Sequence, residues 1–176
     1  VVNVMGPGMV IDIKHLCGEI AKLREAGIKI SPKNLKISDK AIITMPYNVL
    51  QDVMEEDRLT RATGKPYGST RRGIAPVYAD KYMKKAFRMG ELLNLELLYK
   101  RLPDIVDWKN LTIKAYGFEP VTVAEMKEYF ETYGKPLADY VCDVGIYLNE
   151  ANKAGKNIMF EAQLGALRDI DFGIVP

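Results

Sequence analysis

Basic residues and small hydroxyl residues share one run in the middle of the chain. Between Arg58 and Arg88 there are nine Lys or Arg and a single acid, Asp80. The same run contains Gly68, Ser69, Thr70 and Gly73. Small residues let backbone N–H groups approach an anion, and hydroxyls donate to phosphate oxygens. A loop over 58–76 that leads into a helix would add the helix dipole, so the pattern predicts a phosphate-binding loop.

Two other interpretations of this basic run remain open. A run of charges is commonly just a solvated face. It could also bind nucleic acid, but it has few aromatic residues, and no pattern of a nucleic-acid-binding module occurs. Phosphate binding is therefore favoured over a polynucleotide partner.

A second cluster lies near the end of the sequence. A predicted strand over 157–162 leads into a turn that contains Gly165, with Gln163 beside it and acids at Asp169 and Asp171. In α/β sheets, ligands lie at the carboxyl ends of strands, so Gln163 is a candidate ligand contact. An ordinary strand end with a solvated acidic loop is the alternative. Two carboxylates so close in sequence are weak support for a cation site.

Composition excludes several kinds of chemistry and of protein. The 176 residues are 48% hydrophobic and 27% charged with a net charge of +2, which is typical of a globular protein. The single histidine, His15, excludes a histidine-based triad or a histidine-rich metal site within this sequence. Cys17 and Cys142 are predicted to be reduced, which favours a cytoplasmic protein. No apolar run approaches the ~18–20 residues that span a bilayer, so no membrane partner is expected.

Hydrophobic periodicity predicts an α/β fold. We expect strands of a mostly parallel sheet with a long, predominantly helical insertion. The predicted divisions are a strand–helix–strand part over 1–44, a mostly helical part over 45–156, and a returning strand and turn over 157–176. Predicted helices begin at Ile13, Pro46, Val77, Thr122 and Pro136, and the one from Val77 is expected to run to about Tyr99. A break is predicted at Pro103, with an irregular stretch or short helix over 108–116. Both ends are apolar, which suggests the middle piece of a longer protein.

Two long motifs resemble those of the adenylosuccinate synthetases. The sequence G-S-T-R-R-G-I-A-P-V-Y-A-D-K at 68–81 resembles the family's G-T-T-x-R-G-I-G-P-x-Y-x-D-K. The sequence F-E-A-Q-L-G-A-L-R-D-I-D-F-G-I-V-P at 160–176 resembles F-E-G-A-Q-G-x-L-L-D-I-D-H-G-T-Y-P. The segment 6–12 and the helix after it are similar to the family's G-N-G-V-V-x-D region. The resemblance covers essentially the whole chain.

The resemblance implies a ligase of AMP biosynthesis. The family joins inosine monophosphate (IMP) to L-aspartate with GTP hydrolysis, needs Mg²⁺, and forms homodimers with shared sites. By motif, Ser69 and Thr70 would contact the IMP phosphate, Lys81 would be the signature lysine of the catalytic machinery, and Lys84 would reach IMP bound by the partner subunit. Gln163 would be the amide near the nucleotide. Magnesium ligands are expected outside this segment.

Departures from the family pattern bear on these roles. Lys84 replaces an arginine and cannot make a bidentate contact, Ala75 replaces a glycine, and Phe172 stands where histidine is usual. Gln163 is displaced by one position, which leaves open whether it or Leu164 faces the nucleotide. The alternative function is a non-catalytic nucleotide-phosphate-binding fragment that has no activity on its own.

Overall fold

The computed structural model describes residues 1–66, 68–162, 165, 167, 169 and 172–174. The chain divides into two compact units, Val1–Val144 and Gly145–Pro176, and each is described by itself. In chain order the elements are β1 (Asn3–Met5), β2 (Val10–Ile11), α1 (Ile13–Glu25), β3 (Leu35–Ser38), β4 (Ile42–Ile43), α2 (Pro46–Thr63), α3 (Ile74–Tyr82), the 3₁₀ helix η1 (Met89–Leu93), α4 (Leu95–Ala115), α5 (Val123–Tyr129), the π-helical η2 (Phe130–Gly134), the 3₁₀ helix η3 (Lys135–Tyr140), β5 (Val141–Cys142) and α6 (Val144–Lys153).

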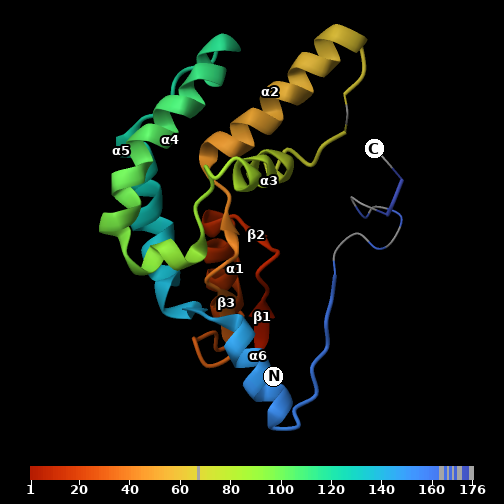
Figure 1. The fold of residues 1–176 in the computed structure, drawn as a ribbon, viewed down its shortest axis with the longest axis vertical. Helices are drawn as coiled ribbons and strands as arrows, with labels where there is room; N and C mark the ends of the chain where they lie inside the picture. The colour runs from red at the N-terminus through yellow and green to blue at the C-terminus, as the bar shows by residue number, and fades with distance from the viewer. Residues whose placement is uncertain (67, 163–164, 166, 168, 170–171, 175–176) are drawn as a thin grey trace. The chain divides into compact units, whose positions relative to one another are not determined.

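The strands of the larger unit form two small parallel sheets. One has the order β1-β3-β5, and the other pairs β2 with β4. Asn3 lies opposite Leu35, and Ile37 lies opposite Val141. Parallel neighbours require a crossover connection, and α1 lies between β1 and β3 in the sequence. The predicted α/β fold with parallel strands and many helices is confirmed (Figure 1).

The first helix follows its sequence signals. The Asp12 carboxylate accepts a hydrogen bond from the His15 N–H at 2.9 Å, as an N-cap should. Gly27 follows the helix with φ +83°, a conformation that favours glycine. Ile13, Leu16 and Ile20 are buried at helical spacing, so α1 packs one apolar face into the core.

The loop predicted over 58–76 is shorter in the structure. Residues 58–63 continue α2, which ends where Gly64 adopts φ +72°. Residues 74–76 already belong to α3, whose N-cap is Gly73. The left-handed glycine supplies the stop signal at the end of α2, because it satisfies the last carbonyl groups without a Cβ clash. The connecting loop is therefore 64–73.

The predicted break at Pro103 is wrong. The helix α4 runs through Pro103 to Ala115, so the stretch over 108–116, predicted to be irregular or a short helix, belongs to this long helix as far as Ala115. Pro103 is on the exposed side, whereas Leu102 and Ile105 beside it are buried. Burial of the opposite face offsets the lost backbone hydrogen bond. The single helix predicted from Val77 to about Tyr99 is instead α3, a turn, η1 and the start of α4.

Two further predictions fail towards the end of the chain. The helix predicted from Pro136 is divided by β5, because Val141 and Cys142 pair with β3 in the sheet. In the smaller unit, the segment 157–162 forms no strand, and Met159 and Phe160 are 89% and 81% exposed. A strand needs a hydrogen-bonded neighbour, and none pairs with it among the described residues.

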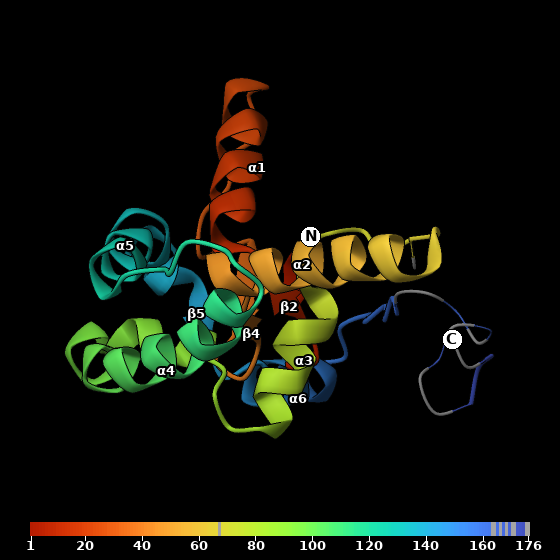
Figure 2. The ribbon, with the colours of Figure 1, turned by 90° about the horizontal axis from the view of Figure 1, so that it is seen from above.

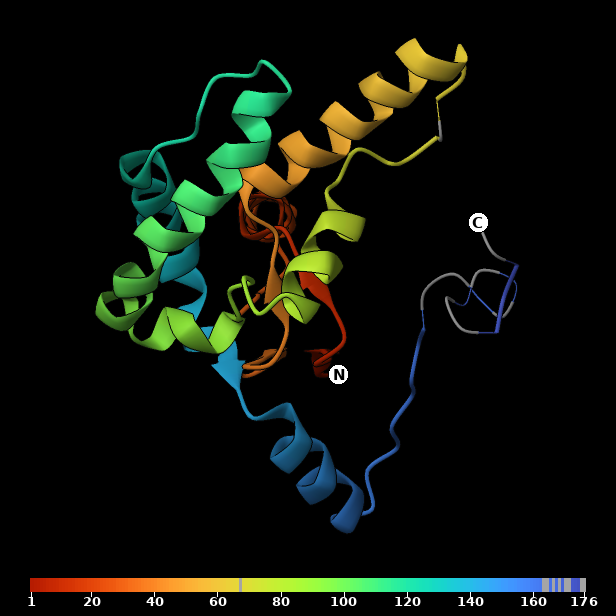
Figure 3. The same cartoon turned by 45° about the horizontal axis from the view of Figure 1, so that its top comes forward.

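The core of the larger unit contains an aromatic group between its helices. Phe87 and Phe130 meet edge to face, with ring centroids 5.3 Å apart, and both are fully buried. In Figure 3 the strands of this unit are seen between α4 and α3. The helix α3 packs against α2 (Figure 2). Among the described residues, no helix is long and apolar enough to cross a membrane.

Candidate functional site

A buried polar stripe on α2 faces the basic loop. Asn48, Asp52 and Glu56 follow one another at four-residue spacing, which puts them on one face of the helix. They are only 2%, 9% and 3% exposed. Polar side chains are buried at this depth when hydrogen bonds satisfy them. All three bind residues of the segment 68–80.

The two carboxylates of the stripe bind the loop backbone. Glu56 accepts hydrogen bonds from the N–H groups of Gly68 at 3.3 Å and Ser69 at 2.7 Å. Asp52 accepts from the Ser69 hydroxyl at 2.7 Å and from the Gly73 N–H at 2.8 Å. Hydrogen bonds to a charged group are stronger than neutral ones. The carboxylates of α2 therefore hold the loop at Gly68, Ser69 and Gly73.

Gly73 is required by the closeness of this contact. A Cβ at position 73 would lie 2.7 Å from the Asn48 carbonyl carbon and 2.8 Å from the Val49 nitrogen. The residue also has φ +75°, which L side chains rarely adopt. Its N–H is bound by Asp52, so the start of α3 already has an anionic partner.

Ser69 and Thr70 have different surroundings. The Ser69 hydroxyl donates to Asp52 and accepts from the Arg71 N–H at 3.0 Å, so it is engaged within the loop. Thr70 is exposed, and its hydroxyl makes no hydrogen bond to the described residues. Arg71 adopts φ +54°, an uncommon conformation for a residue with a side chain. The loop thus presents Thr70 outward while Ser69 maintains its shape.

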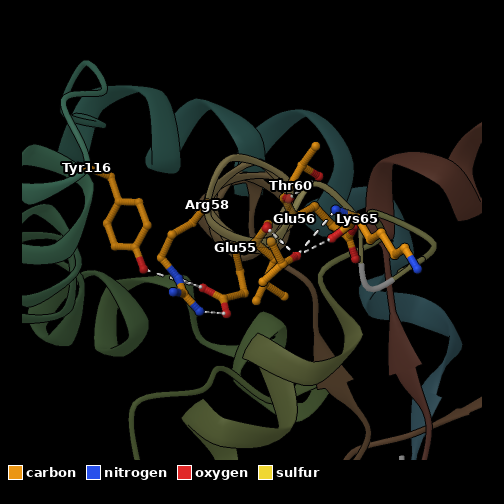
Figure 4. A network of polar contacts seen from close by, with 8 residues as sticks. Glu55, Glu56, Arg58, Thr60, Lys65 and Tyr116 are labelled. Carbon is orange, nitrogen blue, oxygen red and sulfur yellow. Dashed lines mark hydrogen bonds and ion pairs between the residues drawn. The ribbon is translucent and has the colours of Figure 1, made fainter.

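A separate ion pair lies beside the stripe on α2. Arg58 donates to Glu55 at 2.6 and 2.7 Å, and the Tyr116 hydroxyl is 3.5 Å from the same carboxylate. The hydrogen bonds from Arg58 lower the pKa of Glu55. In Figure 4 the Glu55 and Arg58 side chains point towards Tyr116, and Glu56 lies on the opposite side of Glu55 from Tyr116. Among the described residues, neither member of this exposed pair is hydrogen-bonded to the loop.

Lys81 and Lys84 line one open depression. It has a volume of about 410 Å³, and its lining also includes Arg88, Arg101 and Glu91. Arg101 is paired with Glu91, which leaves an excess of positive charge. Lys81 lies on α3, with its ammonium 5.9 Å from the centre of the Tyr78 ring.

In a continuous helix, Lys84 would lie on the same face as Lys81, three residues earlier. The structure differs, because the helix does not extend to Lys84. The helix α3 ends at Tyr82, and Lys84 lies in the following turn with φ +60°. Both side chains nevertheless line the same depression. The turn, rather than helical spacing, brings them together.

The last turn of α3 is fixed by a buried ion pair. Lys109, from α4, donates to Asp80 at 2.6 Å and to Gln51 at 2.7 Å. Asn48 donates to the other oxygen of Asp80 at 2.7 Å. Burial lowers the pKa of Lys109, and the hydrogen bond to Asp80 opposes that shift. Asp80 directly precedes Lys81, so this contact sets the position from which Lys81 extends.

The remaining predicted groups lie in other parts of the sequence. Gln163 and Asp171 lie outside the described residues. His15 is exposed on α1, 3.5 Å from Glu19. Cys17 and Cys142 are free thiols, as predicted. No group of three or more His, Cys, Asp or Glu side chains that could hold a metal ion occurs among the described residues.

Sequence reasoning missed the buried polar residues. The spacing of Asn48, Asp52 and Glu56 was a signal, because a polar stripe on a helix that also buries Met54 requires partners. Lys109 gave no such signal. A lysine in a helical pattern is usually solvated, and its partner Asp80 is 29 residues away in sequence.

Comparisons with known proteins cover the whole chain. The family model described as adenylosuccinate synthetase matches residues 1–176. The chain is 41% identical over 174 residues to the adenylosuccinate synthetase of Pelotomaculum thermopropionicum, covering 98% of this chain and 40% of that protein. It is 35% identical over 176 residues to that of Clostridium novyi, covering 99% and 40%. The chain thus spans about 40% of the length of these curated relatives.

A solved structure agrees with the sequence comparisons. The fully ligated adenylosuccinate synthetase from Plasmodium falciparum superposes with a TM-score of 0.84 at 29% identity, over 98% of this chain and 39% of that one. The same enzyme is therefore found by fold and by sequence. Since the family model matches every residue from 1 to 176, the chain belongs to the adenylosuccinate synthetase family.

Proposed function

We propose that this chain is the IMP-binding segment of a GTP-dependent ligase that joins IMP and L-aspartate to form adenylosuccinate in AMP biosynthesis. The observation that carries the proposal is the loop 64–73, which α2 holds on both sides of the exposed Thr70, at Ser69 and at Gly73. The proposal also draws on similarity to adenylosuccinate synthetases along the whole chain. GTP is the proposed co-substrate of the complete enzyme. Mg²⁺ is its proposed cofactor, with no ligand assigned among the described residues.

The chain's own residues would bind and orient the substrate phosphate. The exposed Thr70 hydroxyl, which has no partner among the described residues, would donate to a phosphate oxygen, whereas the Ser69 hydroxyl keeps the loop in shape through Asp52. Lys81 and Lys84 would supply positive charge from their depression. In a homodimer, Lys84 would act on IMP held by the partner subunit. Gln163 is assigned to the nucleotide by the family motif alone.

The carboxylates of α2 would make the loop ready for binding. Three backbone N–H groups and one hydroxyl are already bound to Asp52 and Glu56. A loop ordered before binding loses less conformational entropy when the ligand arrives. IMP binding would therefore need no rearrangement of Gly68 or Gly73.

Binding of IMP to the 176-residue chain tests this function by calorimetry. Thr70→Val removes the hydroxyl at nearly constant shape, and loss of one hydrogen bond to a charged phosphate should weaken binding by about 10- to 100-fold. Thr112→Val, at an exposed position on α4, is the matched control and should bind as the parent does. Equal affinities for the parent and Thr70→Val would remove Thr70 from the site.

Activity separates the two forms of the proposal. Adenylosuccinate formation is measured with IMP, GTP, L-aspartate and Mg²⁺. IMP binding without turnover by the 176-residue chain would favour the alternative of a nucleotide-phosphate-binding fragment. Turnover that follows the protein through repurification would establish the ligase activity in this chain.

A further inference from the structure

We infer that Lys109 is a positioning residue for the substrate site, acting through Asp80 on α3. This inference rests on the proposed function, because it concerns the same basic side chains. Lys109 lies on α4 and does not line the depression that Lys81 and Lys84 share. Its effect on a bound phosphate would pass through the helix that carries Lys81.

The side chain of Lys109 joins three helices at one buried point. Its ammonium donates to Asp80 of α3 at 2.6 Å and to Gln51 of α2 at 2.7 Å, while its backbone belongs to α4. Asn48 of α2 holds the second oxygen of Asp80 at 2.7 Å. Both oxygens of Asp80 are thus used, each by a different helix. The rotation of α3 and its position along its axis are fixed by these contacts.

The Lys109 ammonium and the Asp80 carboxylate are both buried, so each needs the other as a partner. Lys109 and Asp80 are 1% and 3% exposed. The ammonium lies 5.1 Å from the centre of the Tyr47 ring and 5.0 Å from that of Trp108, within range of cation–π attraction. A buried ion pair is poor evidence for stability, because apolar residues of similar volume often stabilise as well. Directional contacts do give a defined geometry, which apolar packing specifies less tightly.

The ion pair fixes the same helix, α3, that carries Lys81 and leads into the turn with Lys84. Asp80 directly precedes Lys81, and the Asp80 carbonyl accepts the Lys85 N–H at 2.8 Å in the turn that contains Lys84. At the other end of α3, the Val77 N–H donates to the carbonyl of Gly73 at 3.0 Å, which connects the helix to the loop. A shift of α3 would therefore move Lys81 and the Lys84 turn and disturb the contact at Gly73.

Two variants of the ion pair and one control test the inference. Lys109→Met removes the charge and leaves the Asp80 carboxylate buried, and the double variant Lys109→Met/Asp80→Asn removes both charges. Lys114→Met changes an exposed lysine on the same helix. For each protein, the urea midpoint of unfolding and the affinity for IMP are measured.

The double variant separates positioning from stability. We expect Lys109→Met to bind IMP about tenfold or more weakly with a lowered urea midpoint, and Lys114→Met to stay within about twofold of the parent. In the double variant the midpoint should return towards that of the parent, because no unpaired charge is left buried. Affinity should stay at least about fivefold weak, because a methionine at position 109 donates no hydrogen bond to position 80 and α4 no longer fixes α3. Recovery of affinity together with stability would assign Lys109 a structural role only and overturn the inference. If Lys109→Met does not fold, the double variant decides alone.

Amide hydrogen exchange tests the positioning role of Lys109 without any measurement of IMP binding. If the parent chain binds no IMP, the proposed function fails for this chain, and exchange at the Lys85 N–H still reports the position of the turn. That N–H should exchange about tenfold or more faster in both ion-pair variants than in the parent or in Lys114→Met. Unchanged exchange in the folded double variant would overturn the positioning role whatever the IMP result.

Discussion

Gly73 offers a direct test of how closely the basic loop contacts α2. Alanine at this position must take φ +75° and place its Cβ 2.7 Å from the carbonyl carbon of Asn48. The neighbouring atoms belong to the backbone of α2, so no side chain can rotate away to make room. Relief of the overlap requires the loop to move back from the helix. That movement lengthens the 2.8 Å hydrogen bond from the Gly73 N–H to Asp52.

Gly64 supplies the matched control. It has φ +72°, nearly the same as Gly73, but no atom lies within 4 Å of the position of a Cβ. Gly64→Ala should therefore show the conformational cost alone, about 1–2 kcal/mol. Gly73→Ala should add the loss of a hydrogen bond to a charged acceptor, about 1.5–3 kcal/mol. We expect Gly73→Ala to lower the free energy of unfolding by about 2.5–5 kcal/mol in total.

Urea unfolding of the 176-residue chain measures both values by linear extrapolation. The difference between the two variants is the informative quantity, because the cost of the left-handed conformation is nearly the same in each. Equal losses of stability would refute the close contact between the loop and α2. A larger loss for Gly64→Ala would refute it as well.

Further predictions concern the buried carboxylate, a pH-dependent pair and the lysine of the turn. Asp52→Asn should lower the free energy of unfolding in urea by about 1.5–3 kcal/mol, because one amide oxygen cannot replace two carboxylate oxygens. The exposed Glu55→Gln should lower it by less than about 1 kcal/mol, and similar losses for the two variants would contradict the role of Asp52 in holding the loop. Burial, and then the hydrogen bond to Glu131, raise the pKa of Tyr99 from 10.0 to about 12. The contribution of neutral Tyr99 to stability is complete below pH 10 and is lost as pH rises to about 12. Tyr99→Phe should therefore flatten the fall of the free energy of unfolding over this pH range, and an unchanged slope would contradict the raised pKa. Lys84→Ala keeps a Cβ at φ +60° and should weaken IMP binding about tenfold without a change in the unfolding midpoint; a lowered midpoint with unchanged affinity would make this lysine structural.

The local elements were largely determined by short-range sequence signals. Asp12 and Gly27 mark the two ends of α1, and Pro46 marks the start of α2, because capping and proline geometry depend on residues close in sequence. The capping box at Thr122 likewise gave the start of α5. The family motif at 68–81 could also be read from the sequence alone, since its residues are contiguous.

Tertiary packing decided the places where prediction failed. Pro103 is accommodated within α4 because the helix buries its opposite face, and Val141 and Cys142 form β5 because β3 provides hydrogen-bond partners. Neither the buried face nor the partner strand is visible in a local window of sequence. The segment 157–162 has the composition of a strand but pairs with no neighbour among the described residues.

The sequence by itself determined which basic and hydroxyl residues the candidate site contains. The tertiary structure decided which of these residues face outward, where they can contact a ligand. Ser69 and Thr70 are adjacent hydroxyl residues in one motif, so sequence treats them alike. Folding brings Asp52 to within 2.7 Å of the Ser69 hydroxyl and leaves Thr70 exposed. The same long-range packing buries Lys109 against Asp80, 29 residues away. Hydrogen-bond partners distant in sequence are chosen by packing, so only the folded chain separates the residues that shape the site from those that face a ligand.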